Sequence, residues 1–335
     1  MVRHLKLALF LFVSLFLGAC ADGTTSEGGA TTTTSGSTTG EDATDATDGA
    51  AGEADTDTDS AAGEAEPAEE AAPADGPEEG EPAGELDTAG CVVHDGIEYC
   101  HEAFTPDGVD APAPLVIDLH GLNSSAQRQR AGSGFERLAA DEGFTVVWPQ
   151  GHDNSWNGGR RCCGTAAADD LDDIGYLRAL VDEVSARHPV DPARVYATGL
   201  SNGCAMAQRL AADASDLVAA VGCMALYLLD EPDPGYQPVP VMELHGTDDR
   251  VVGYGTGPES GAEANFEAWA EHNGCSGSPV VEEGDGFQTT VHQACDGADV
   301  ALVTVIGGGH ALYQGMETSV DTSRLAWDFM RQFRR

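Results

Sequence analysis

The sequence predicts an α/β protein with a mostly parallel β-sheet that is covered by helices on both faces. Two observations over residues 91–335 support this prediction. Short apolar runs typical of buried strands alternate with segments of helical periodicity. Several of these runs also end at Gly, Ser, Asp or His. In parallel sheets, functional groups gather in the loops at the carboxyl ends of the strands.

Residues 1–20 are predicted to be a signal peptide. A basic start precedes an apolar run at residues 7–17, which is typical of an export signal and short for a membrane span. The sequence Leu-Gly-Ala-Cys at 17–20 resembles a bacterial lipobox. We therefore expect acylation of Cys20 and attachment to a bacterial cell-envelope membrane through this lipid alone. Ordinary cleavage after Ala21 is the alternative.

Residues 21–90 are predicted to be a disordered acidic linker. They contain no Lys or Arg, and Leu86 is their only large apolar side chain. Such a segment buries too little apolar surface to offset its ordering entropy, and its like charges keep it extended. A calcium-binding or adhesive tail is the alternative, but no ligand spacing supports it.

The charge of the chain excludes one class of partner. The formal net charge is -41 at pH 7, and residues 91–335 remain acidic without the linker. An acidic surface repels nucleic acids and other anionic polymers. We therefore expect an extracytoplasmic protein that acts on neutral or cationic material. Residues 91–335 have the size of a single α/β domain, which we expect to be monomeric.

The elements of residues 91–335 follow from the apolar pattern. Strands are predicted at 92–99, 115–119, 144–148, 195–198, 217–221, 240–244 and 301–306. Helices are predicted at 126–142, 171–187, 262–272 and 319–333, and after Ser201. Asp172 and Asp173 fit the start of a helix. The segment 151–165, rich in Gly, Asn and Cys, is predicted to be a loop.

The domain is organised around Gly-Leu-Ser-Asn-Gly at 199–203. A strand precedes this motif and a helix follows it, which is the context of a nucleophile elbow. Glycines are needed two residues before and after Ser201 because larger side chains would collide with neighbouring elements. The helix start directs N–H groups and its positive dipole end at the site. Ser201 is the predicted nucleophile, and the N–H of Asn202 is a predicted oxyanion donor.

A serine nucleophile needs a base and an acid that orients the base. The predicted base is His310, which follows three glycines after the last strand; a surface histidine is the alternative. The predicted acid is Asp249, with Asp248 as its competitor. The order Ser, Asp, His along the chain is that of α/β-hydrolases, and the N–H of Leu122 is the second predicted oxyanion donor.

Three further side chains have two interpretations each. His120 and His245 are each followed by Gly and are expected to be structural. A metal site built from these two residues and His310 is the alternative, but no metal-binding spacing supports it. We expect neither a metal nor a cofactor. Trp156 either lines a substrate pocket or anchors its loop by packing.

Nine cysteines in an exported chain indicate disulfides. With Cys20 reserved for lipid, the others allow many connectivities. The pairings that we favour are Cys91–Cys100, Cys162–Cys163, Cys204–Cys223 and Cys275–Cys295. A metal–thiolate site is the alternative, but the sequence has no C-x-x-C spacing.

Several motifs follow one another in a specific order. They are Leu-His-Gly at 119–121, Trp-Asn-Gly at 156–158, Cys-Cys-Gly at 162–164, Asp-Asp-Ile-Gly at 172–175, Gly-Leu-Ser-Asn-Gly at 199–203, His-Gly-Thr-Asp-Asp-Arg-Val-Val at 245–252 and Gly-Gly-His-Ala at 308–311. Together they resemble the polyhydroxybutyrate depolymerase/feruloyl esterase family of secreted α/β-hydrolases. The resemblance implies the α/β-hydrolase fold, a triad acid at Asp249 and a Cys275–Cys295 disulfide. The sequence departs from the family at Cys204, usually Gly, and at Leu312, usually Trp. Both positions are expected near the cleft.

These observations predict a secreted serine carboxylic-ester hydrolase that works through an acyl-enzyme. Its expected substrate is a hydroxyalkanoate oligomer or a feruloyl, other aryl or acyl ester. The alternatives are a serine peptidase on the same fold, a non-catalytic surface binding protein and a metal-dependent hydrolase.

Overall fold

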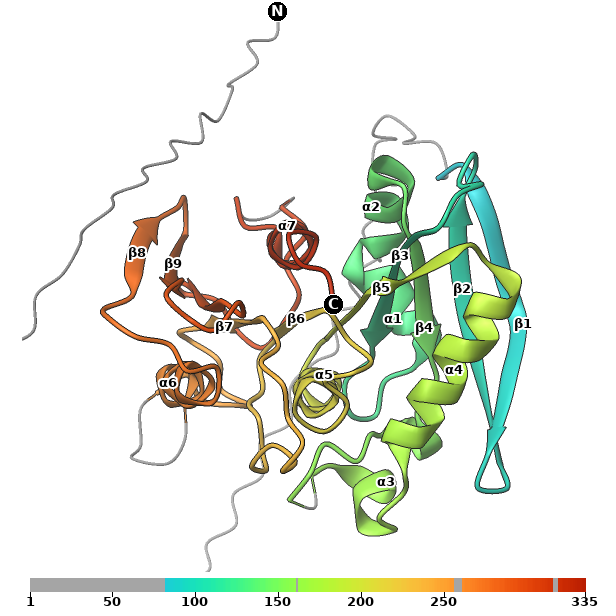
Figure 1. Cartoon of the computed structure of the whole chain (residues 1–335), viewed down its shortest axis with the longest axis horizontal. Coiled ribbons are helices and arrows are strands. Elements are labelled where there is room, and N and C mark those ends of the chain that lie inside the picture. The colour runs from blue at the N-terminus through green and yellow to red at the C-terminus, as the bar shows by residue number, and fades with distance from the viewer. Residues whose placement is uncertain (1–81, 161, 256–260, 316–318) are drawn as a thin grey trace, which may run out of the picture. The chain divides into compact units, whose positions relative to one another are not determined.

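The computed structural model describes residues 82–160, 162–255, 261–315 and 319–335 (Figure 1). The predicted signal peptide at 1–20, with Cys20, and the predicted linker up to residue 81 lie outside the described residues. Residues 1–73 and 74–335 are separate units. The fold is therefore that of the second unit.

A ten-stranded sheet runs through this domain. Its order is β1 (Gly84–His94), β2 (Ile97–Pro106), β4 (Thr145–Pro149), β3 (Ala113–Leu119), β5 (Val190–Gly199), β6 (Ala220–Met224), β7 (Val241–Gly246), β10 (Val300–Val305), β9 (Phe287–His292) and β8 (Val280–Glu283). The strands from β4 to β10 in this order are parallel. The flanking pairs are antiparallel. The prediction of a mostly parallel sheet is confirmed.

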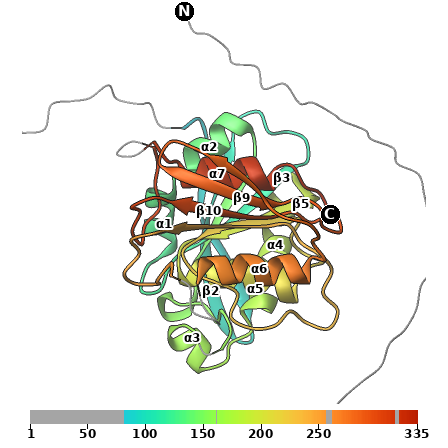
Figure 2. The ribbon, with the colours of Figure 1, turned by 90° about the vertical axis from the view of Figure 1, so that its left-hand side faces the viewer.

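Helices cover both faces of the sheet (Figures 1 and 2). One face carries α4 (Asp173–Arg187), α5 (Asn202–Asp213) and α6 (Ala262–His272), and the other carries α1 (Ala126–Ser133), α2 (Phe135–Glu142) and α7 (Thr322–Met330). A short helix, α3 (Gly164–Ala168), and a 3-10 turn, His152–Asn154, lie in the loop after β4. Of the described helices, none has both the length and the apolarity that crossing a bilayer requires.

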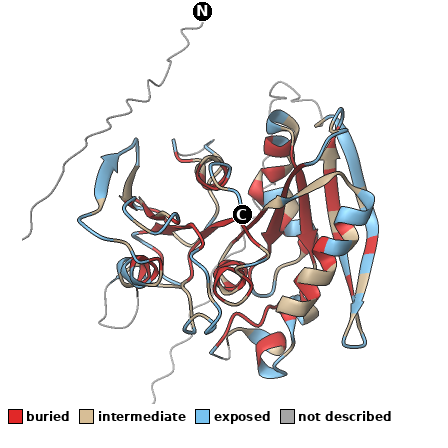
Figure 3. Ribbon diagram, viewed as in Figure 1, coloured by how far each residue is buried: buried red, intermediate tan, exposed pale blue. Residues whose placement is uncertain are grey.

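Each face of the sheet buries its own apolar cluster, and β3, β4, β6 and β7 are buried along their whole length (Figure 3). Beneath α4, the rings of Tyr99 and Tyr176 stack with centroids 4.0 Å apart. On the opposite face, Phe144 stacks on Trp327 of α7 at 4.1 Å. Burial on both faces explains why these strands are mostly apolar, with Asp118, Glu243 and His245 as buried exceptions.

Two predicted elements are divided in the structure. The predicted strand 92–99 is a hairpin between β1 and β2, because Asp95 and Gly96 take positive φ values of 48° and 80° at its turn. The predicted helix 126–142 is divided into α1 and α2. Gly134, with φ 73°, ends the first helix and precedes the second.

The linker prediction extends too far along the chain. β1 begins at Gly84, so residues 84–90 belong to a strand. Most of these side chains are exposed, and the segment is held by antiparallel backbone pairing with β2. Composition did not reveal it because such pairing needs no apolar side chains. The exposed β8 and its partner β9 were missed for the same reason.

The described cysteines pair as Cys91–Cys100, Cys162–Cys163, Cys204–Cys223 and Cys275–Cys295. The first pair links opposite positions of β1 and β2. The third links α5 to β6. These are the pairings favoured from the sequence.

The two described ends of the domain lie at the same edge of the sheet. β1 runs parallel to β4, since both are antiparallel to β2, and Gly84 lies opposite Pro106 at the end of β2. At the other end of the chain, the N–H of Arg335 donates to the carbonyl of Ala193 in the first half of β5, at 3.0 Å. This edge is formed by the amino ends of the parallel strands.

Asp118 is a buried carboxylate within the otherwise apolar β3. It accepts hydrogen bonds from Gln129 Nε2 of α1 at 2.7 Å and from Trp148 Nε1 of β4 at 2.8 Å. Burial raises the pKa of Asp118 to about 6, although these bonds favour the charged form.

We expect Asp118→Asn to alter the pH dependence of stability. The folded pKa of Asp118 exceeds the ordinary value of 3.8, so the native state retains a proton that the unfolded chain releases. Asp118 therefore lowers the free energy of unfolding as the pH rises between these two values. The difference in free energy of unfolding, variant minus wild type, should be larger at about pH 6.5 than at about pH 4 by about 1–3 kcal/mol. Urea unfolding at both pH values measures this, and a pH-independent difference would contradict it.

Candidate active site

Ser201 lies at the sharp turn between β5 and α5. Its φ of 56° and ψ of -121° are unfavourable for any residue other than glycine. Its backbone N–H donates to the carbonyl of Met224 at 2.8 Å, which holds the turn against the end of β6. This strained turn between strand and helix is the geometry of a nucleophile elbow.

Two glycines allow the elbow to pack against β3. A Cβ added at Gly199 would lie 2.5 Å from the carbonyl oxygen of Leu119, and one added at Gly203 would lie 2.1 Å from the same atom. Neither distance is possible for a side chain, as the sequence predicted. The loop after β3 also lies beside the elbow, since a Cβ on Gly121 would be 3.7 Å from the Cβ of Ser201.

The two predicted oxyanion donors belong to these adjoining segments. Asn202 is the first residue of α5, and Leu122 lies in the loop after β3. Within the described ranges, neither backbone N–H donates a hydrogen bond to another residue. Both N–H groups are therefore free to bind an oxyanion.

His120 holds the loop that carries Leu122. Its ring is fully buried, and its Nε2 accepts a hydrogen bond from the N–H of Gly151 at 3.0 Å. The other ring nitrogen, Nδ1, therefore carries the proton and donates to the carbonyl of Gly121 at 2.8 Å. Burial lowers the pKa of His120 and keeps the ring neutral. These contacts agree with a structural histidine.

Asp249 and His310 meet at the carboxyl ends of β7 and β10. Asp249 Oδ2 accepts a hydrogen bond from His310 Nδ1 at 2.7 Å, and Asp249 Oδ1 accepts from the N–H groups of Val251 and Val252, each at 2.8 Å. Burial alone would raise the pKa of Asp249, but these hydrogen bonds outweigh it and lower the pKa. The carboxylate thus stays ionised and leaves His310 Nε2 as the proton acceptor.

The competitor, Asp248, lies elsewhere in the same loop. Its side chain is exposed, while its N–H donates to the carbonyl of Gly308 at 2.8 Å. The N–H of Gly307 in turn donates to Thr247 Oγ1 at 2.8 Å. The loops after β7 and β10 are therefore joined, and their joining directs Asp249 rather than Asp248 at His310.

The hydrogen bond between the serine and the histidine is not formed. Ser201 Oγ and His310 Nε2 have no hydrogen-bond partner among the described residues. Catalytic hydrogen bonds of this kind often tighten only when substrate binds. The structure thus joins Asp249 to His310 and leaves the Ser201 hydroxyl without a partner among the described residues.

Trp156 serves as an anchor in this structure. The side chain is fully buried, and its Nε1 donates to the carbonyl of His120 at 2.9 Å. The Asn202 side chain holds both backbone groups of Trp156, accepting from its N–H at 2.8 Å and donating to its carbonyl at 2.9 Å. Since the indole exposes no surface to a substrate, the packing interpretation is favoured over the pocket interpretation.

Cys204 and Leu312, the two departures from the family pattern, both pack against apolar clusters. Cys204 is fully buried and disulfide-bonded, and its N–H donates to the carbonyl of Ser201 at 2.8 Å. Leu312 is half-buried and packs against the apolar cluster beneath α7.

The three histidines of the alternative metal site have other partners. The ring nitrogens of His120 are held by Gly121 and Gly151, and those of His245 by Glu243 at 2.8 Å and the carbonyl of Val252 at 2.9 Å. No shared site results among the described residues. The buried Glu243 had been overlooked, although a charged residue within the apolar run 240–244 was a visible signal.

Comparison with known proteins agrees with this geometry. Residues 101–254 match the family model described as esterase PHB depolymerase. The match includes the Ser201 elbow and the Asp249 loop, whereas His310 lies beyond it.

The chain is also similar to two proteins that are named as an esterase and a depolymerase. The chain is 32% identical over 244 residues to feruloyl esterase B of Piromyces equi, covering 67% of this chain and 43% of that protein. It is 29% identical over 241 residues to poly(3-hydroxyalkanoate) depolymerase C of Paucimonas lemoignei, covering 61% and 56%. The chain thus spans about half the length of these two relatives.

The solved structures support the fold. An acetyl xylan esterase from Aspergillus awamori superposes with a TM-score of 0.57 at 15% sequence identity, covering 74% of this chain and 99% of that one. This likeness confirms the predicted α/β-hydrolase fold of the domain.

We expect Gly203→Ala to destabilise the elbow because the new methyl would overlap the carbonyl of Leu119. The loss should be at least about 2 kcal/mol, since backbone must move to relieve the overlap. Gly132→Ala in α1 is the matched control: its added Cβ meets nothing within 4 Å, and it should be neutral or slightly stabilising. Urea unfolding measures both, and equal stabilities would contradict the close packing.

Proposed function

We propose that the chain is an exported serine carboxylic-ester hydrolase with Ser201 as nucleophile, His310 as base and Asp249 as orienting acid. One observation carries this proposal. The Asp249–His310 hydrogen bond of 2.7 Å lies at the same sheet edge as the strained turn of Ser201 and its two free N–H groups. Acyl transfer needs these parts together, and the esterase names of the relatives favour it.

The reaction begins with a proton transfer. His310 Nε2 takes the hydroxyl proton of Ser201 as Oγ attacks the ester carbonyl. The N–H groups of Asn202 and Leu122 bind the resulting oxyanion. When the tetrahedral intermediate collapses, the C–O bond to the alcohol breaks and His310 returns the proton to the departing alkoxide. Water then releases the acid by the same steps, with His310 again as base.

The substrate that we propose is a hydroxyalkanoate oligomer or a feruloyl or related acyl ester. The relatives named feruloyl esterase and poly(3-hydroxyalkanoate) depolymerase support these two classes. The acidic domain favours a neutral ester over a polyanion.

We propose further that the domain acts outside the cytoplasm as a monomer. The four disulfides of the described residues fit an oxidising compartment. In this proposal residues 1–20 direct export, Cys20 carries the lipid anchor, and the acidic segment that follows is a linker to the catalytic domain. We place the start of the catalytic domain at β1, which begins at Gly84 rather than at residue 91.

We expect Ser201→Ala to lose at least about a thousandfold in kcat/KM on esters. The full chain is assayed on nitrophenyl acetate and butyrate, methyl ferulate, a hydroxybutyrate trimer and an anilide. Circular dichroism shows whether the variant is folded. A folded wild type without serine-dependent ester hydrolysis would refute the proposal. In that event, cleavage of the anilide alone would indicate a peptidase, and no cleavage at all a binding protein.

Asp249→Asn should reduce kcat by about a thousandfold or more, since the amide favours the wrong tautomer of His310. Asp248→Asn is its matched control, because it removes an adjacent carboxylate that is exposed and does not contact His310. It should retain activity within about threefold of wild type. Equal losses in the two variants would contradict the assignment of Asp249.

A further inference from the structure

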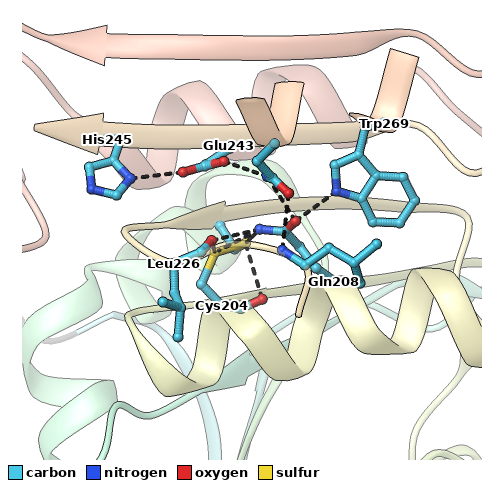
Figure 4. Close-up of a disulfide and its surroundings, with 9 residues drawn as sticks. Cys204, Gln208, Leu226, Glu243, His245 and Trp269 are labelled. Atoms are coloured by element: carbon cyan, nitrogen blue, oxygen red, sulfur yellow. Dashed lines mark hydrogen bonds and ion pairs between the residues drawn. A yellow bond between two sulfur atoms is a disulfide. The ribbon is translucent and has the colours of Figure 1, made fainter. Parts of the chain in front are cut away.

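Two buried ionisable side chains lie behind the triad acid. Glu243 and His245 stand two residues apart on β7 and therefore point to the same face. They are 2% and 0% exposed, and His245 Nδ1 lies 2.8 Å from Glu243 Oε1 (Figure 4). The proposed mechanism assigns neither residue a role.

Hydrogen-bond directions along this network can be assigned from its fixed donors. Trp269 Nε1 can only donate, so Gln208 Oε1 is the acceptor of that 2.7 Å bond (Figure 4). The N–H of Leu228 donates to Asn265 Oδ1 at 3.0 Å, so the Asn265 amide nitrogen faces Glu243 Oε2. Glu243 Oε2 must therefore accept, and Oε1 remains for His245.

The other side of the His245 ring faces the triad. Its Nε2 lies 2.9 Å from the carbonyl oxygen of Val252 and 3.5 Å from Asp249 Oδ2. Acceptors thus face both ring nitrogens. Burial alone would lower the pKa of His245, but Glu243, Val252 and Asp249 outweigh it and raise the pKa. Burial raises the pKa of Glu243 as well. The two residues share one proton as a pair that is neutral overall, with its positive end toward Asp249.

The surroundings keep this pair dry. Tyr227 stacks on the His245 ring with centroids 5.4 Å apart, and Tyr254 meets it edge-on at 5.8 Å. Burial raises the pKa of both tyrosines, so neither adds a charge. Asp248 and Arg250, the other charged residues of the same loop, are exposed and screened by solvent.

We propose that Glu243 and His245 are positioning residues that hold the Asp249 loop and reduce the proton affinity of His310. This inference rests on the proposed function and deepens it. The positive end of the pair draws the negative charge of Asp249 away from His310. His310 is thereby kept unprotonated, and so able to act as a base, at a lower pH than Asp249 alone would permit.

Glu243→Gln removes the charge and keeps the shape. The amide oxygen accepts from Asn265, and the amide nitrogen donates to His245 Nδ1, which leaves a neutral ring that still donates from Nε2. We expect the acid limb of the kcat/KM profile to move up by about half a pH unit. The direction of this movement distinguishes two explanations. If the variant acted only by losing a nearby negative charge, protonated His310 would be disfavoured and the acid limb would move to lower pH. His245→Gln should move the limb up too, and the double variant should move it no further, because the residues act as a unit.

Asp248→Asn is the matched control for these variants. It removes an exposed carboxylate from the same loop, so the acid limb should move by less than about 0.2 units, and downward. A second measurement does not depend on enzymatic activity. The titration midpoint of the His310 ring, followed by NMR in the full chain and identified by its loss in His310→Gln, should rise in Glu243→Gln by the same half unit.

The outcomes separate this inference from the proposed function. Serine-dependent hydrolysis with an unmoved or lowered limb in Glu243→Gln would overturn the role of the pair and leave the esterase standing. A raised His310 midpoint in a protein that hydrolyses no ester would support the pair and overturn the esterase. A loss of kcat without any change in the pH profile would mean that the pair only supports the fold, and would also overturn the inference.

Discussion

The carbonyl oxygen of Leu119 lies so close to the elbow that no side chain fits at position 199 or 203. This backbone packing brings the end of β3 against the turn after β5. It places the loop of Gly121 and Leu122 beside the turn that carries Ser201, so that two segments distant in sequence, each with an N–H group free of backbone partners among the described residues, lie side by side. The proposed oxyanion site would thus follow from how closely two parallel strands and one helix can approach.

Around this contact, the loops are fixed by buried polar groups. His120 holds the oxyanion loop, and Asn202 holds the Trp156 segment against the start of α5. Each of these side chains satisfies backbone groups that would otherwise be buried without partners. The cost of leaving such groups unpaired is what gives irregular loops a single conformation.

Much of the candidate site could be predicted because its signals are local. The elbow, Asp249 and His310 each follow a recognisable strand, and parallel strands bring their carboxyl ends together. The partners of Glu243 could not be predicted in this way. Asn265 and Gln208 come from helices far from it in sequence, and only packing makes them neighbours. β1 and β8 also escaped prediction, because edge strands are held by backbone pairing with little apolar burial.

The position of β1 bears on access to the candidate site. Gly84 and Arg335 lie at the amino edge of the parallel strands, whereas Ser201, Asp249 and His310 lie at the carboxyl edge. The described chain therefore enters the domain at the edge opposite the one that carries these three residues. A bulky or insoluble ester could reach that edge without meeting the strand through which the chain enters.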